Sequence, residues 1–146
     1  MTEYLIDVNL GSTDKMTEIT KFISFTRKNR DKFVLVFGGT KYKSELKKVH
    51  NLHRYVFELK KLNQAYEVNV IDVDSGEDYF KQFQTCIHDD PHIYSIVNKS
   101  NCKIIATQDQ GISDFFSTYP KSIWGRRPEF YYKSDSVYDS FFRKYK

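Results

Sequence analysis

Residues 4–9 of the chain read YLIDVN, an apolar run that is interrupted near its end by Asp7. Further short runs rich in Val, Ile and Phe occupy residues 33–37, 68–73 and 103–107. None of these runs alternates cleanly between apolar and polar residues, which is typical of strands that are covered on both faces. Together with residues 4–8, they predict a mainly parallel sheet buried between helices.

Segments with helical periodicity separate these runs. Apolar side chains recur at steps of three and four over residues 13–29, 42–62, 78–87, 90–100 and 135–145. Strand and helix therefore alternate along the chain, which is the order of βαβ units. The sequence predicts an α/β fold, specifically a three-layer α/β/α sandwich with a central, mainly parallel sheet. No linker interrupts the 146 residues, so we expect a single domain over residues 1–146.

The composition narrows the class of protein. The chain has 23 Lys and Arg against 19 Asp and Glu, a formal net charge of +4 that is compatible with an anionic partner such as nucleic acid. Its 12 Phe and 11 Tyr favour a packed core over disorder. Cys86 and Cys102 form no CxxC pair, so we expect reduced thiols. No apolar run reaches the roughly 20 residues of a membrane span, and residues 1–10 lack the basic start of a signal peptide. We therefore expect a cytoplasmic protein.

Carboxylates follow or end the predicted strands. Asp7 lies toward the end of the first strand, and Asp109 comes directly after residues 103–107. Asp90 precedes Pro91, which suits the first position of a helix, so Asp90 is expected to be an N-cap. Because right-handed crossovers bring the C-terminal ends of parallel strands to one edge of the sheet, we expect these carboxylates to meet there.

Glu45 extends this group of acids. It follows the second predicted strand through Gly38 and Gly39, and it lies near the start of the predicted helix 42–62. Like charges at close range cannot all stay ionised without a cation. Oxygen ligands without a His or Cys set favour Mg²⁺ or Mn²⁺, and such ions suit phosphodiester cleavage. A simpler interpretation stays open, in which Asp90 and Asp109 only cap helices and Glu45 is an ordinary surface residue.

Three stretches of the chain resemble the PIN-domain (PIN-like) ribonuclease family. In YLIDVN (4–9), an Asp is followed two residues later by the small polar Asn9, which looks like the first strand of PIN domains. DPHI (90–93) and CKIIATQD (102–109) are similar to the C-terminal half of the family, where an acid precedes a helix and an apolar strand leads into Thr-x-Asp. SEL (44–46) is similar to the helix that supplies the second acid. The resemblance covers roughly residues 4–116.

The resemblance implies a metal-dependent endonuclease that hydrolyses phosphodiester bonds, with single-stranded RNA as the expected substrate and Mg²⁺ or Mn²⁺ as the cofactor. Single-stranded or structured DNA is the alternative substrate. It also implies a regulatory or antitoxin protein as a partner, as in toxin–antitoxin pairs, and it allows a homodimer. Carried over residue by residue, it implies catalytic and metal-binding roles for Asp7, Glu45, Asp90 and Asp109, and supporting roles for Asn9, Thr107 and Asp114. His92 is expected on a helix face and not as a ligand.

Basic residues mark candidate contacts with nucleic acid. Lys41 and Lys43 lie at the predicted long helix, and Arg126 and Arg127 stand among aromatic residues near the C-terminus. Interleaved cations and rings suit a single strand, with phosphates on the cations and bases on the rings. The alternative is a solvated helix face and, around residues 126–132, a final strand.

Two other functions compete with the nuclease hypothesis. The chain could be a catalytically inactive PIN-like subunit that binds nucleic acid or another protein. It could also be a receiver-like phosphorylation module, because Asp72 or Asp74 would end a predicted strand. Such a module needs a pair of acids at the end of the first strand, where Asp7 stands alone. Fold alone does not decide among these functions.

Overall fold

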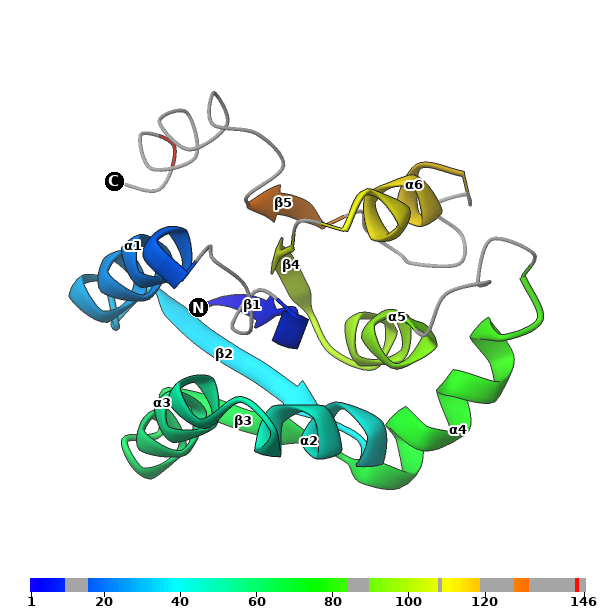
Figure 1. Cartoon of the computed structure of the whole chain (residues 1–146), viewed down its shortest axis with the longest axis horizontal. Coiled ribbons are helices and arrows are strands. Elements are labelled where there is room, and N and C mark those ends of the chain that lie inside the picture. Colours follow the sequence, from blue (N-terminus) through cyan, green and yellow to red (C-terminus); the bar gives the residue numbers. More distant parts are fainter. Residues whose placement is uncertain (10–15, 84–89, 108, 119–127, 132–143, 145–146) are drawn as a thin grey trace.

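The computed structural model describes residues 1–9, 16–83, 90–107, 109–118, 128–131 and 144. Its centre is a sheet in which every strand pairs in parallel with its neighbours, in the order β3-β2-β1-β4-β5 (Figure 1). The strands are β1 (Thr2–Ile6), β2 (Phe33–Gly38), β3 (Ala65–Val68), β4 (Cys102–Ala106) and β5 (Glu129–Tyr131). The predicted α/β class with a parallel central sheet is confirmed.

Helices connect successive strands. They are α1 (Met16–Lys28), α2 (Thr40–Lys47), α3 (His50–Lys61), α4 (Val70–Phe80), α5 (Pro91–Asn98) and α6 (Gln110–Thr118). The chain steps outward from β1 to β2 and β3, and then returns to β4 and β5 on the other side of β1. Right-handed crossovers therefore place α1–α3 on one face of the sheet and α4–α6 on the other. In Figure 1, α1 and α3 lie on one side of the molecule, and α4, α5 and α6 gather on the opposite side.

Each helical layer has its own aromatic core. Under α1 and α3, the Tyr4 ring contacts Phe22 edge-on at 5.4 Å, and the hydroxyls of Tyr4 and Tyr55 are 3.0 Å apart. Under α5 and α6, the rings of Tyr94 and Phe115 stack at 3.8 Å. Buried aromatic pairs of this kind stabilise the fold beyond the area they bury. Both faces of the sheet are thus covered, as the unbroken apolar strands predict.

The prediction of a strand over residues 68–73 is wrong. The strand β3 ends at Val68, and α4 begins at Val70. The side chain of Asn69 starts this helix, because its Oδ1 accepts hydrogen bonds from the main-chain N–H groups of Ile71 at 2.9 Å and Asp72 at 3.2 Å. Asp72 therefore lies in a helix, as does Asp74, and neither ends a strand. The feature that suggested a receiver-like module is absent from this part of the chain.

The predicted helix 42–62 is two helices. Val49 separates α2 from α3 with an extended backbone, at φ −118° and ψ 86°. The apolar spacing continues through the break, since Leu46 and Leu52 are both buried, so periodicity alone cannot reveal it. The break lets α2 pack on β2 and α5 while α3 packs on β3.

Other predicted boundaries also shift. The prediction of a helix over residues 78–87 is wrong at its start, because α4 begins at Val70 and already ends at Phe80. Residues 84–89 lie outside the described residues. The helices predicted at 13–29 and 90–100 correspond to α1 and α5. The helix predicted at 135–145 falls almost entirely outside the described residues. None of the described helices combines the length and apolar character needed to cross a lipid bilayer.

A tight turn fixes where α2 begins. Gly39 has φ +81°, and a Cβ built there would lie 2.5 Å from Val73 Cγ1 in α4. Only glycine adopts this backbone without strain and also leaves room for the neighbouring helix. The turn places α2 directly beyond the C-terminal end of β2, next to α5.

Candidate metal centre

The ends of β1 and β4 bring Asp7 into a buried position at the C-terminal edge of the sheet. The two strands pair in parallel, and the Asp7 N–H continues the ladder by donating to the Ala106 carbonyl at 2.9 Å. Asp7 is only 3% exposed. A carboxylate held this deep requires hydrogen bonds or a counter-charge.

Hydrogen bonds orient the Asp7 carboxylate. The Thr107 hydroxyl donates to Oδ2 at 2.8 Å, and the main-chain N–H of Asn9 donates to Oδ1 at 3.2 Å. Thr107 Oγ1 also accepts from the Asp109 N–H at 3.0 Å. Thr107 and Asn9 therefore both support the acid, as the resemblance implies, and Asn9 does so through its main chain.

Asp109 lies where β4 leads into α6. Its Oδ1 accepts from the Gly111 N–H at 2.8 Å, so it caps the start of α6, as the simpler interpretation allowed. After burial, the charge of Asp109 is the next largest influence that raises the pKa of Asp90, so the two carboxyls lie close together. Asp109 thus combines a structural role with a place beside another acid.

Asp90 occupies the N-cap position of α5, yet its side chain makes no capping hydrogen bond. The residue is 7% exposed. Burial, followed by the charges of Asp109 and Asp7, raises the pKa of Asp90 to about 7. Burial also raises the pKa of Asp7, against the hydrogen bonds from Thr107 and Asn9. The structure therefore brings Asp7, Asp90 and Asp109 together from three separate segments.

His92 joins Glu45 to this group. His92 Nε2 lies 3.2 Å from Glu45 Oε2, and the histidine is 2% exposed. The charge of His92 acts to lower the pKa of both Asp7 and Asp90, so the ring lies near both carboxyls. The expectation that His92 is an ordinary helix-face residue is therefore too simple, because the ring faces the acids. Its position two residues after Asp90 is the only signal in the sequence.

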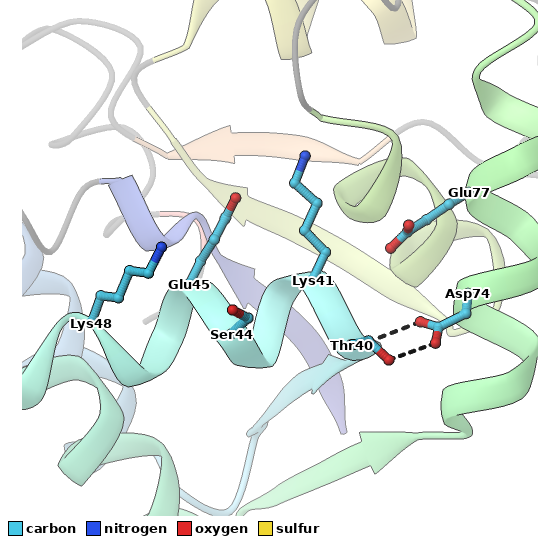
Figure 2. A pocket seen from close by; sticks show the side chains of 7 residues that line it. All are labelled: Thr40, Lys41, Ser44, Glu45, Lys48, Asp74 and Glu77. Atoms are coloured by element: carbon cyan, nitrogen blue, oxygen red, sulfur yellow. Dashed lines mark hydrogen bonds between the residues drawn. The ribbon is translucent and has the colours of Figure 1, made fainter.

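A pocket of about 540 Å³ opens beside Glu45. Figure 2 shows its lining side chains, which come from α2, its C-cap residue and α4; they are Thr40, Lys41, Ser44, Glu45, Lys48, Asp74 and Glu77. Both carboxylate oxygens of Asp74 accept hydrogen bonds from Thr40: Oδ1 from the main-chain N–H at 2.9 Å and Oδ2 from the hydroxyl at 2.6 Å. Glu45 thus lines the pocket, and its contact with His92 links the pocket to the surroundings of Asp7 and Asp90.

Glu77 is a functional candidate that the sequence analysis missed. Its Oε1 is buried and has no hydrogen-bond partner among the described residues. Burial raises its pKa, while the charge of His92 opposes that rise. The signal for Glu77 is the Asn69 cap, since a helix begun there carries Glu77 two turns along toward α5.

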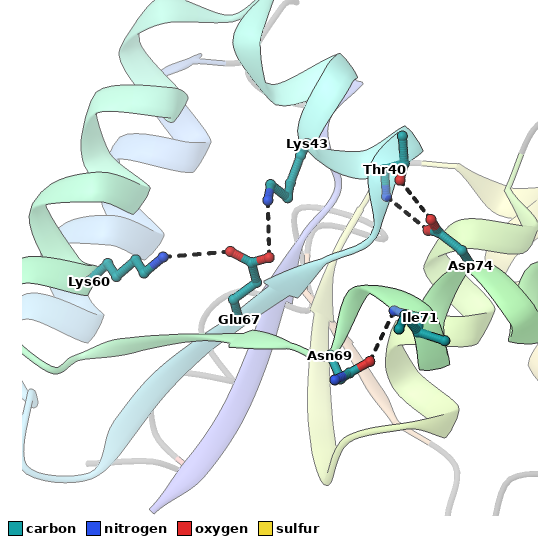
Figure 3. A network of polar contacts seen from close by, with 7 residues as sticks. All are labelled: Thr40, Lys43, Lys60, Glu67, Asn69, Ile71 and Asp74. Atoms are coloured by element: carbon teal, nitrogen blue, oxygen red, sulfur yellow. Dashed lines mark hydrogen bonds and ion pairs between the residues drawn. The ribbon is translucent and has the colours of Figure 1, made fainter.

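Other predicted site residues do not join the acids. Asp114 is exposed and accepts a hydrogen bond from Gln110 Nε2 at 2.8 Å. Lys43 pairs with Glu67 at 3.0 Å, and Lys60 approaches the same carboxylate at 3.5 Å (Figure 3). Lys43 is therefore engaged away from the pocket that Lys41 lines.

The C-terminal candidates have a different outcome. Arg126 and Arg127 lie outside the described residues. The neighbouring residues Glu129–Tyr131 form β5, which pairs with β4. For these residues, the alternative of a final strand is the one that the structure shows.

The donor chemistry of this site suits a divalent cation. Asp7, Asp90 and Asp109 offer carboxylate oxygens, and in the described part of the chain no Lys or Arg forms an ion pair with them. Within those same residues, no three acidic, His or Cys side chains already stand at ligand positions around one point. Burial, and after it the charges of Asp109 and Asp7, raises the pKa of Asp90, and a bound Mg²⁺ or Mn²⁺ would favour the ionised form of these carboxyls.

Comparisons with protein-family models, with curated proteins and with solved structures gave no match to this chain.

Proposed function

We propose that this chain is a metal-dependent endonuclease that hydrolyses phosphodiester bonds, with single-stranded RNA as its substrate. One observation carries the proposal: the buried Asp7 and Asp90 and the half-buried Asp109 converge at the C-terminal edge of a parallel sheet. Ligands of open α/β sheets bind at this edge. We place the activity in the cytoplasm, because Cys102 is a free, buried thiol.

Each residue has a definable task in such a site. Asp7, Asp90 and Asp109 would hold Mg²⁺ or Mn²⁺, with Glu45 beside them. When bound, the ion supplies positive charge that polarises a phosphodiester and favours attack by water. Thr107 donates to Asp7 Oδ2 and thereby orients this acid, and His92 Nε2, 3.2 Å from Glu45 Oε2, would position the Glu45 carboxylate. A pKa of about 7 lets Asp90 shed its proton near neutral pH, where it becomes a full anionic ligand.

The test is cleavage of a labelled single-stranded RNA in Mn²⁺, compared between the parent chain and two matched variants. Asp7→Asn should abolish cleavage and leave the fold intact, because an amide can still accept from the Asn9 N–H. Asp114→Asn makes the same change of charge on an exposed acid outside the group, and it should leave the rate unchanged. The proposal fails if the parent cleaves neither RNA nor DNA, or if Asp7→Asn cleaves at the parental rate. Binding without cleavage would favour the inactive nucleic-acid-binding subunit.

A further inference from the structure

One face of α2 carries charges in a row along the pocket. Lys41, Glu45 and Lys48 are separated by four and then three residues, so they stand about one helical turn apart on the same face. Figure 2 shows that their side chains point to the same side of α2. The two lysines are separated by about 10 Å along the helix axis, from a rise of about 1.5 Å per residue. The pocket therefore has a cation on either side of a carboxylate.

The Glu45 carboxylate is connected to Asp7 and Asp90 through His92. Glu45 Oε2 lies 3.2 Å from His92 Nε2, and His92 lies near Asp7 and Asp90. A phosphate that reaches the acids next to Glu45 would have its neighbours in the same strand near Lys41 and Lys48. The Ser44 hydroxyl, also in the pocket lining, adds a neutral donor to this row.

The remaining acids of the pocket, Asp74 and Glu77, lie on α4, across the pocket from the row on α2. Both Asp74 oxygens accept hydrogen bonds from Thr40. Burial raises the pKa of Glu77, and the charges of His92 and, more weakly, Lys41 oppose that rise; Lys41 and Glu77 line the same pocket. In Figure 2 the side chains of Asp74 and Glu77 point from α4 toward α2, and those of Lys41 and Lys48 extend from α2.

We propose that this row is a track for the backbone of a single-stranded polynucleotide, with Lys41 and Lys48 receiving the phosphates on either side of the one that enters beside Glu45. The proposal rests on the proposed nuclease function, because it takes the acids as the destination of the middle phosphate. Asp7 and Asp90 are buried and lie outside the pocket lining, and Glu45 with its partner His92 stands between the pocket and these acids, so the middle phosphate has to bend inward beside Glu45. A single strand bends this way, and a cationic groove suits its backbone.

The track selects two lysines among several close in sequence. Lys43 is paired with Glu67, and Lys47 is exposed on α2 but does not line the pocket. Lys47 is therefore a matched control, with the same charge on the same helix. This selection also replaces Lys43, a predicted nucleic-acid contact, with Lys48.

The test measures binding of a fluorescent single-stranded oligonucleotide by anisotropy in EDTA, where metal-dependent cleavage cannot occur. The variants of the full chain are Lys41→Gln, Lys48→Gln, the double change, and Lys47→Gln. The double variant should bind at least tenfold more weakly, and the slope of log K against log salt should become shallower by about 0.7 for each lysine removed. Lys47→Gln should stay within twofold of the parent. Measuring the affinity for an RNA strand and for a DNA strand of the same sequence shows which of the two polynucleotides the row binds more tightly.

Several results would overturn the track. The proposal fails if the parent chain does not bind the single strand, or if the double variant binds it no more weakly than Lys47→Gln does. It also fails if the parent binds a duplex as tightly as the single strand. Cleavage in Mn²⁺, assayed separately, reports on the nuclease function. Loss of binding in the double variant together with no cleavage by the parent would refute the nuclease and support the track. Cleavage by the parent together with unchanged binding in the double variant would support the nuclease and refute the track.

Discussion

The Thr107 hydroxyl donates a 2.8 Å hydrogen bond to Asp7 Oδ2 across 100 residues of sequence. The same hydroxyl oxygen accepts from the Asp109 N–H at 3.0 Å. One small side chain at the end of β4 therefore positions an acid at the end of β1 and the start of the segment that carries a second acid. This contact ties the geometry of the candidate metal centre to the pairing of the two strands.

Removing that hydroxyl should weaken metal binding more than it weakens the fold. Thr107→Val keeps the shape of the side chain but leaves Asp7 Oδ2 without its donor, and we expect affinity for Mn²⁺ to fall by roughly 10- to 100-fold. Thr107→Ser keeps the donor and should bind nearly as well as the parent. Calorimetric titration with Mn²⁺ measures both. Equal affinities for the Val variant and the parent would show that the hydrogen bond does not orient a ligand.

The stability of the metal-free chain should fall as pH rises from about 4 to about 7. The folded chain keeps the Asp90 proton up to a pKa of about 7, whereas the unfolded chain releases it near the ordinary value of 3.8. In that window the folded state binds more protons, so the free energy of unfolding decreases with pH, by at most about 1.4 kcal/mol per pH unit. Chemical unfolding in EDTA across this range measures the slope.

Two comparisons assign that slope to Asp90. Asp90→Asn cannot titrate and should flatten the dependence, while Asp114→Asn, at an exposed position, should keep it. Adding Mg²⁺ or Mn²⁺ should stabilise the parent most above pH 7, where the ligand carboxylates are ionised. A slope that persists in Asp90→Asn would assign the pH dependence to other groups.

Replacing His92 should separate function from stability. His92→Leu fills the buried site with an apolar side chain and removes the ring nitrogen that contacts Glu45 Oε2. His92 Nδ1 is buried without a hydrogen-bond partner among the described residues, so its loss costs little, and we expect the free energy of unfolding to change by less than about 1 kcal/mol. Cleavage should nevertheless drop at least tenfold, because Glu45 is no longer held.

The matched variant is His92→Gln, whose amide can donate to Glu45 and should recover part of the activity. Urea unfolding and the rate of RNA cleavage are the two measurements. If both variants cleave as the parent does, His92 has no positioning role in the reaction.

Much of the fold was predictable because burial on both faces leaves a clear pattern in a strand. The apolar runs that become β1, β2 and β4 stand out for this reason. The run at residues 68–73 could not be assigned from its pattern, because a short apolar run fits a strand or a buried helix equally well, and the Asn69 cap begins a helix here. The break at Val49 was invisible, since α2 and α3 share one apolar spacing on either side of it.

The sequence by itself determined that Asp7 and Asp109 would lie at one edge of a parallel sheet, because each stands at the end of an apolar run that reads as a strand covered on both faces. Only the tertiary structure decided what surrounds them. The approach of His92 to Glu45, and of Glu77 to the pocket that Lys41 and Lys48 line, depends on how α2, α4 and α5 pack together at the edge of the sheet. Helix packing is set by contacts between residues distant in the chain, and local spacing carries no record of it.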